Sequence, residues 1–215
     1  MAFPTSPSNN QVHRESGSNR TYVYDSTLGV WDQVKEAQSD ISNIAGHISN
    51  EVTGFTGIKN CDTWRLHSTF YSTTSLQVIN VNWEHDDTYS AGHIGQGVSE
   101  RNGIFTFPAT GIWSIRFYME TNGNGGARTW IQAMLMITTD NESSWNYADY
   151  IVQQAYTNNA HACGASEKVF KVENITTHKC RFNAYGAGDA RIFGESSVNR
   201  TYAVFTRIGD LEYGT

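Results

Sequence analysis

One stretch of this sequence decides its fold: Gly103-Ile-Phe-Thr-Phe-Pro-Ala-Thr-Gly-Ile-Trp-Ser-Ile-Arg-Phe-Tyr-Met119. It predicts a short strand, a tight turn at the proline and glycine, and a second strand in which apolar and polar side chains alternate. The expected core residues are Trp113, Ile115, Phe117 and Met119, and the opposite face holds Ser114, Arg116, Tyr118 and Glu120. The stretch therefore predicts two neighbouring strands of a β-sandwich.

Similar strand-like runs recur along the chain, separated by polar turn clusters. Only 17% of the 215 residues are charged and 19 are glycine, a composition typical of an all-β protein with many turns. The ten predicted strands are Leu66–Tyr71, Leu76–Trp83, Ile104–Phe107, Ile112–Glu120, Thr129–Thr138, Ala148–Tyr156, Glu167–Val172, Lys179–Tyr185, Ala190–Phe193 and Arg200–Ile208. They fit a mainly β, two-sheet jelly-roll sandwich with a smaller N-terminal piece attached.

Charge and hydropathy argue against several functions. The formal net charge is −6 and the 15 Lys and Arg residues form no cluster, so no nucleic-acid partner is expected, because binding a phosphate backbone needs concentrated positive charge. No apolar run approaches the roughly 20 residues of a membrane-spanning helix, so no membrane insertion is expected. The N-terminus lacks the basic and apolar regions of a secretory signal, so we expect synthesis in a cytoplasm.

The three cysteines are predicted to be free thiols. Cys61, Cys163 and Cys180 lack the spacing of metal ligands, and a reducing compartment keeps such thiols unpaired. Pairing of Cys163 with Cys180 across neighbouring strands is the alternative that the sequence leaves open.

The opening stretch resembles a known signature, carried by Phe105, Gly111, Trp113, Ile115 and Phe117. In the complement-q/tumour necrosis factor superfamily, these positions span two adjacent jelly-roll strands. Trp113 and Ile115 stand where that family usually has Tyr and Phe. The closing run Tyr202-Ala-Val-Phe-Thr-Arg-Ile208 is similar to the family's last core strand. The resemblance implies a jelly-roll head over residues 61–215 that forms trimers around an apolar axis.

Residues 1–31 are predicted to form an N-terminal arm. Two of the three prolines lie in the first seven residues, so the arm begins extended. A β-hairpin with residues 25–29 as its turn is expected to follow. This pattern resembles a module of bacteriophage tail-fibre and other virion proteins, in which a proline-rich opening precedes an aromatic hairpin. The resemblance implies virion attachment through Phe3, Pro4, Tyr22, Tyr24 and Trp31. An ordered terminal arm with exposed aromatic residues is the alternative.

Residues 32–60 are predicted to form a helical neck and linker. Apolar residues spaced alternately by three and four form the seam of a coiled coil, and isoleucine at both kinds of seam position favours three or four strands. The expected trimer interface consists of Val34, Ala37, Ile41, Ile44 and Ile48. An amphipathic helix packed on its own β-domain is the alternative, because it has a similar apolar stripe.

No catalytic motif is found, so the chain is not expected to be an enzyme. It has no Gly-x-Ser-x-Gly elbow, no glycine-rich phosphate loop and no His-Glu-x-x-His. No cofactor is predicted, and calcium is the only metal for which the sequence offers candidate ligands. One candidate site is the acidic cluster Glu84-His85-Asp86-Asp87, because carboxylates suit this ion. The other is Asp189, since the family resemblance implies that it meets its symmetry mates near the trimer axis, where family members sometimes hold calcium. Solvated turns are the alternative explanation for both segments.

Two polar loops are candidates for ligand binding. Aromatic side chains beside amides can stack on a sugar ring and bond its hydroxyl groups. The candidate residues are Trp145, Asn146, Tyr147, Tyr150 and His161. The alternating aromatic residues also fit the entrance of a core strand.

These features predict a homotrimeric virion structural protein of bacteriophage, of the tail-fibre or surface-fibre type. Its arm would contact other virion proteins, and its head would bind the host surface, with a glycan as the expected ligand. A capsid decoration or cement trimer is the first alternative. A cellular complement-q-like lectin is the second, and the missing secretory signal counts against it.

Overall fold

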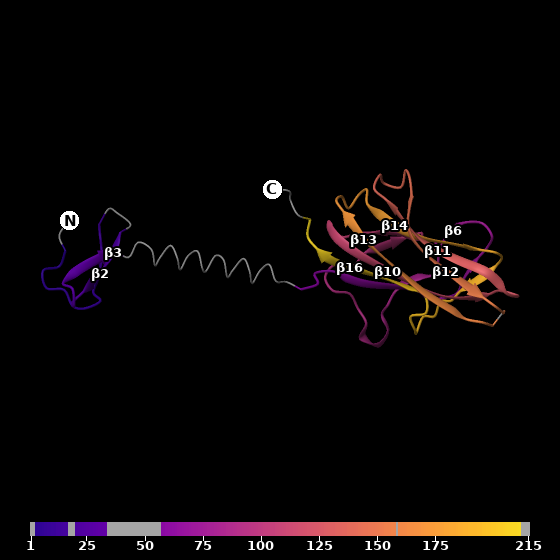
Figure 1. Cartoon of the computed structure of the whole chain (residues 1–215), viewed down its shortest axis with the longest axis horizontal. Helices are drawn as coiled ribbons and strands as arrows, with labels where there is room; N and C mark the ends of the chain where they lie inside the picture. The colour runs from indigo at the N-terminus through magenta and orange to yellow at the C-terminus, as the bar shows by residue number, and fades with distance from the viewer. Residues whose placement is uncertain (1–2, 17–19, 34–56, 158, 212–215) are drawn as a thin grey trace. The chain divides into compact units, whose positions relative to one another are not determined.

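The computed structural model describes residues 3–16, 20–33, 57–157 and 159–211 (Figure 1). The chain divides into two compact units, Met1–Gly57 and Ile58–Thr215. The predicted coiled-coil seam, from Val34 to Ile48, lies outside the described residues. Among the described residues, no helix is long and apolar enough to cross a membrane.

The N-terminal unit is an antiparallel sheet with the order β1-β2-β3. Its strands are β1 (Val12–Arg14), β2 (Thr21–Asp25) and β3 (Val30–Gln33). The predicted hairpin is present between β2 and β3. Asp25 Oδ1 shapes its turn by accepting the backbone N–H groups of Thr27 at 2.7 Å and Leu28 at 3.2 Å. Strand β1 extends the predicted hairpin to three strands.

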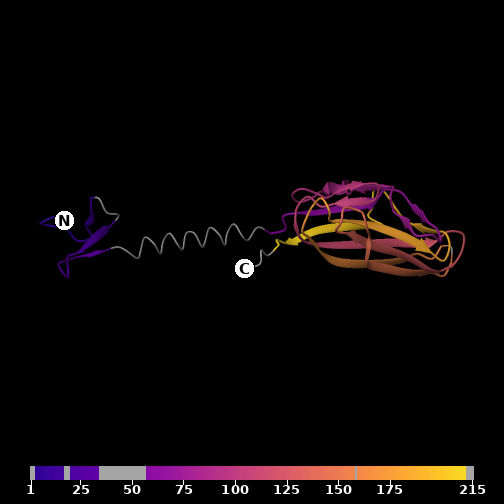
Figure 2. The same ribbon diagram turned by 90° about the horizontal axis from the view of Figure 1, so that it is seen from above.

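The head is a sandwich of two antiparallel sheets (Figure 2). The first sheet has the order β5-β15-β10-β16-β4-β7, and β13 also pairs with β10. Its strands are β4 (Cys61–Leu66), β5 (Phe70–Ser72), β7 (Trp83–His85), β10 (Gly111–Gly123), β13 (Ala162–Val172), β15 (Ala190–Ile192) and β16 (Tyr202–Gly209). The second sheet has the order β12-β11-β14-β9-β8, and β6 also pairs with β14. Its strands are β6 (Gln77–Val78), β8 (Ser99–Arg101), β9 (Ile104–Thr106), β11 (Arg128–Thr138), β12 (Asn146–Ala155) and β14 (Lys179–Gly186).

Aromatic side chains join the two sheets in the core. The predicted buried face of β10 is confirmed, since Trp113, Ile115, Phe117 and Met119 are at most 1% exposed. Phe117 stacks on Phe182 of the second sheet, with ring centroids 4.3 Å apart. Phe105 lies 5.6 Å from Phe182 and 5.0 Å from Phe205, so it contacts rings from both sheets.

Gly111 begins β10 at a position where a larger residue does not fit. Its φ is 144°, and a Cβ built there would lie 2.5 Å from Arg207 Nε and 2.7 Å from the carbonyl oxygen of Gly209. Arg207 is held at this point because its Nε donates a hydrogen bond to the carbonyl of Thr110 at 2.8 Å. The glycine of the signature is therefore required by the close approach of β16.

The prediction of ten strands is wrong, because the described part of the head contains thirteen, β4 to β16. The predicted strand Leu66–Tyr71 is interrupted between β4 and β5, and Leu76–Trp83 is interrupted between β6 and β7, where Asn82 has a φ of 69°. Strand β8 pairs with β9 across Asn102 and Gly103, which have φ values of 54° and 78°. An Asn-Gly pair between strands is a strong hairpin signal, so the sequence contained the information for β8.

The cysteines are free, as predicted. Cys163 is exposed on β13 of the first sheet, whereas Cys180 is buried on β14 of the second. Burial raises the pKa of the Cys180 thiol. Cys180 is therefore a small core residue rather than a reactive group.

The alternation along β10 leads to the first prediction. Replacement of Phe117 by alanine should lower the free energy of unfolding by about 3–5 kcal/mol, because it removes a buried ring and leaves a cavity. Arg116→Ala should cost far less, since that side chain is 53% exposed. Urea unfolding followed by tryptophan fluorescence measures both losses. Equal losses would contradict a strand with one buried face.

Candidate functional site

The outer face of the second sheet presents nine side chains in three rows across β12, β11 and β14. Strand register aligns the rows as Tyr147–Met136–Arg181, Tyr150–Met134–Asn183 and Val152–Gln132–Tyr185. The alternate residues of β11 and β14, such as Leu135 and Phe182, are buried in the core. The nine residues therefore face outward, and together they are called the outer grid.

Tyr147 and Tyr150 form a half-exposed pair in the outer grid. They are 49% and 52% exposed, and their rings are stacked at an interplanar angle of 19° with centroids 5.6 Å apart. In a regular strand, residues three apart point to opposite faces. The pairing of β12 with β11 shifts register between Leu135 and Met136, and this bulge in β12 leaves both tyrosines pointing outward. Gln132 Nε2 donates a hydrogen bond to Tyr147 Oη at 2.7 Å. Burial raises the pKa of Tyr147.

Apart from Val152, which is 46% exposed, the rest of the outer grid is more deeply buried. Met134 and Met136 are only 6% and 9% exposed. The guanidinium of Arg181 lies 4.1 Å from the centroid of the Trp145 ring, a cation–π geometry, and burial lowers its pKa. Two buried polar atoms, Arg181 Nε and Asn183 Oδ1, have no hydrogen-bond partner. Unsatisfied buried polar groups are rare in folded proteins and need an explanation.

The predicted ligand-binding residues fall into two groups. The structure brings Trp145, Tyr147 and Tyr150 to the outer grid or its border, and Asn146 is the exposed first residue of β12. His161 does not join them. It follows the last residue of β12, whereas Asn146 is the first, so a ten-residue strand separates the two ends. The two predicted loops therefore do not form one site.

His161 belongs to a separate polar cluster. Its Nδ1 lies 2.7 Å from Oε1 of Glu120, and Arg200 Nε donates to Oε2 of the same carboxylate at 2.8 Å. His161 stacks on Phe193 with centroids 4.8 Å apart, and the Arg200 guanidinium lies 4.1 Å from the centroid of that ring. The hydrogen bond from Arg200 lowers the pKa of Glu120. These contacts tie the start of β13 to β10 and to the segment before β16.

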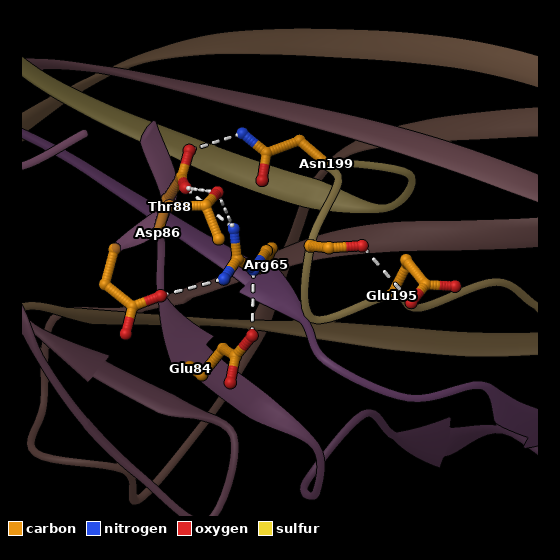
Figure 3. Close-up of polar contacts among 8 residues, drawn as sticks. Arg65, Glu84, Asp86, Thr88, Glu195 and Asn199 are labelled. Atoms are coloured by element: carbon orange, nitrogen blue, oxygen red, sulfur yellow. Dashed lines mark hydrogen bonds and ion pairs between the residues drawn. The ribbon is translucent and has the colours of Figure 1, made fainter. Parts of the chain in front are cut away.

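The acidic cluster of the sequence surrounds Arg65 of β4, which is 1% exposed (Figure 3). Arg65 donates through Nε to Glu84 at 2.8 Å, through Nη1 to Asp86 at 2.7 Å and through Nη2 to Asp87 at 2.9 Å. Asn199 Nδ2 also donates to Asp86, at 2.6 Å. The guanidinium therefore fastens residues 84–87 to β4, and the hydrogen bond from Asn199 connects the loop before β16 to Asp86.

This arrangement argues against the calcium hypothesis. The three carboxylates converge on a guanidinium, and the described residues contain no group of three or more His, Cys, Asp or Glu that could hold a metal ion. Asp189, the other candidate, is exposed, and its backbone carbonyl accepts a hydrogen bond from Arg128 at 2.7 Å. Its surroundings are those of a turn residue.

The predicted attachment residues meet in the N-terminal unit. Phe3 stacks on Trp31 with an interplanar angle of 15°, and it meets Tyr22 edge to face, with both centroid distances 5.1 Å. Tyr24 lies 5.3 Å from Trp31. His13, which the sequence analysis did not single out, adds a fifth ring 5.1 Å from Phe3, because β1 lies beside β2. These five residues are called the aromatic cluster; Pro4 follows Phe3 and is partly buried.

The outer face of the first sheet has a second tyrosine pair. Tyr118 of β10 lies opposite Tyr202 of β16, and their rings stack with centroids 4.4 Å apart at an angle of 12°. Burial raises the pKa of Tyr202. Beside them, Glu167 accepts hydrogen bonds from Ser114 at 2.6 Å and forms an ion pair with Arg116 at 2.9 Å. This face therefore combines aromatic side chains with paired charges.

Comparison with known proteins identifies the fold of the head. Eiger TNF from S. frugiperda is similar with a TM-score of 0.54 and 12% identity, over 72% of this chain and 96% of that chain. Murine APRIL has a TM-score of 0.48 and 10% identity, over 69% of this chain and 99% of that one. PRD1 vertex protein P5 has a TM-score of 0.46 and 10% identity, over 71% and 99%.

The likeness to Eiger TNF supports a TNF-like jelly roll, as the sequence resemblance implied. At this identity the likeness concerns the fold alone, and the two lower scores add nothing to that conclusion. No family model matches the chain, and no curated protein matches it.

The second prediction concerns Arg65. Arg65→Leu should lower the free energy of unfolding by about 3–5 kcal/mol, because it leaves a cluster of carboxylates without their partner. Asp87→Asn should change stability by no more than about 0.5 kcal/mol, since the Asp87 side chain is 81% exposed. Urea unfolding of both variants checks the difference.

The same measurement tests calcium. Millimolar calcium chloride should leave the unfolding midpoint of the wild type unchanged, because the carboxylates are already paired with Arg65. If calcium raised the unfolding midpoint and a chelator lowered it again, the result would support the calcium hypothesis.

Proposed function

We propose that this chain is a homotrimeric virion structural protein of the bacteriophage tail-fibre or surface-fibre type. Its N-terminal unit attaches it to the particle, and its jelly-roll head is displayed for binding to the host surface. The observation that supports this proposal most is the aromatic cluster, since the residues singled out for attachment meet in a unit separate from the head.

The small size of the N-terminal unit supports attachment through it. Units this small bury little apolar surface and usually need a staple or a partner for stability. Every residue of β2 is only partly buried, and Val12 and Leu28 are 58% and 69% exposed. Packing against other virion proteins would complete the burial of this unit.

Two surfaces of the chain are proposed to form the trimer. One is the seam from Val34 to Ile48, which remains a sequence prediction. The other is the outer face of β10 and β16, where Tyr118 and Tyr202 offer flat apolar area and the nearby Glu167 is already paired. Burying such a face around a three-fold axis removes aromatic surface from water without stranding a charge. Three linked heads would also strengthen weak contacts with a host by about 10²–10⁴-fold.

The third prediction tests the trimer. Sedimentation equilibrium should find wild-type particles of three 24.0 kDa chains. Tyr118→Asp combined with Tyr202→Asp should lower the mass or weaken the association, because it places unpaired charges at the interface. Tyr71→Asp is the matched control, since Tyr71 is 55% exposed on the edge strand β5. A monomeric wild type would overturn the proposal.

The fourth prediction tests attachment. Phe3→Ala combined with Trp31→Ala should abolish incorporation into phage particles while the head stays folded, because it removes the stacked rings of the aromatic cluster. Ser26→Ala, in the exposed turn, should incorporate normally. Electron microscopy with a gold-labelled antibody against the head measures incorporation.

The position of the label distinguishes the alternatives. Label at the tail or on fibres supports the fibre role, and label over the capsid shell favours a decoration protein. Particles without label would exclude both virion roles and favour a cellular lectin.

A further inference from the structure

We propose that the outer grid is a carbohydrate-binding platform for uncharged sugar units, with Tyr147 and Tyr150 as its stacking surface. This inference rests on the proposed display of the head toward a host surface and specifies the site and the ligand class. The platform lies across β12, β11 and β14, which are neighbours in the second sheet (Figure 1).

The bulge in β12 gives the platform its shape. Without it, Tyr147 and Tyr150 would point to opposite sides of the sheet, and one ring would enter the core. With it, both rings lie on the same outer face, close to parallel and about half exposed. Bulges often aim side chains at functional sites, and two adjacent flat rings offer a sugar its apolar face contact.

The tyrosine rings are fixed before any ligand arrives. Met134 and Met136 lie beside the tyrosines in the same rows and are almost fully buried, so the pair has apolar neighbours on β11. The hydrogen bond from Gln132 holds the hydroxyl of Tyr147. A platform whose rings are already ordered loses little conformational entropy on binding, which favours a ligand that makes few contacts.

Exposed polar groups beside the rings favour a ligand rich in hydroxyl groups. The hydrogen bond between Gln132 and Tyr147 lies at the exposed surface, so the Tyr147 oxygen and the Gln132 amide are open to the hydroxyl groups of a ligand. Aromatic stacking combined with hydrogen bonds from amides is the recognition chemistry that sugars require.

The charge of the outer grid favours an uncharged sugar. Arg181 is the one charged side chain among its nine residues, and its guanidinium already lies against Trp145. Burial also lowers the pKa of Arg181, so its surroundings disfavour charge. An acidic sugar would gain no free cation here, and a phosphate would gain none either. A neutral hexose or N-acetylhexosamine unit matches the surface better.

The test is a glycan array followed by titration calorimetry on the full-length chain. The array carries neutral hexose and N-acetylhexosamine oligomers beside their sialylated and sulfated counterparts. The wild type should bind neutral probes in preference to the acidic ones. Tyr147→Ala combined with Tyr150→Ala should weaken the best neutral probe by about tenfold or more, because both stacking surfaces are lost.

Three variants control the result. Tyr150→Phe keeps the ring and should retain most of the affinity. Gln132→Leu removes the amide that contacts Tyr147 while keeping most of its volume, and should weaken binding without a large loss of stability. Tyr71→Ala removes a tyrosine of similar exposure from the first sheet and should change nothing.

Several outcomes would overturn the platform. These are a wild type that binds no neutral probe, unchanged affinity in the double variant, or stronger binding of acidic probes. A double variant whose sedimentation mass falls would instead make the outer grid a contact between copies of the chain. Particle incorporation separates this proposal from the virion role: incorporation without sugar binding rejects the platform alone.

Discussion

The stacking of Phe117 on Phe182 couples the longest strand of the first sheet to a central strand of the second, and it orients both outer surfaces of the head. With these rings inward, the pleat of β10 directs Tyr118 outward, and the pleat of β14 directs Arg181 and Asn183 outward. The face proposed for trimer contact and the outer grid thus have one common origin. A change of register in either strand would exchange core and surface on that side.

The core could be predicted from the sequence because period-two alternation is a local property. Trp113 and Phe117 were assigned correctly, since each strand residue needs only its neighbours along the chain to reveal its face. The interruption near Asn82 was missed, because the residues that hold it come from elsewhere: its amide donates to the carbonyls of Ser68 and Thr69 at 3.3 Å. Continuous apolar runs cannot reveal a break that depends on such partners.

The candidate site was predicted only in part, for a similar reason. Tyr147 and Tyr150 were visible as clustered aromatic residues, but the bulge that turns both outward depends on pairing with β11. Gln132 and Asn183 come from two other strands and have no pattern that marks them in sequence. The acidic segment was read as a calcium candidate because its partner, Arg65, precedes Glu84 by 19 residues. Charge density along a chain shows where carboxylates lie, but not which cation neutralises them.

The two ends of the head chain lie together. Strand β4, which opens the head, pairs with β16, which closes it, and Lys59 forms an ion pair with Asp210 at 3.6 Å. The chain therefore enters and leaves the described part of the head at the same end of the sandwich, and the opposite end carries neither point. Mechanical load entering through residues 57–60 would pass first to the hydrogen bonds between β4 and β16, so this pair would bear the pull on an anchored head.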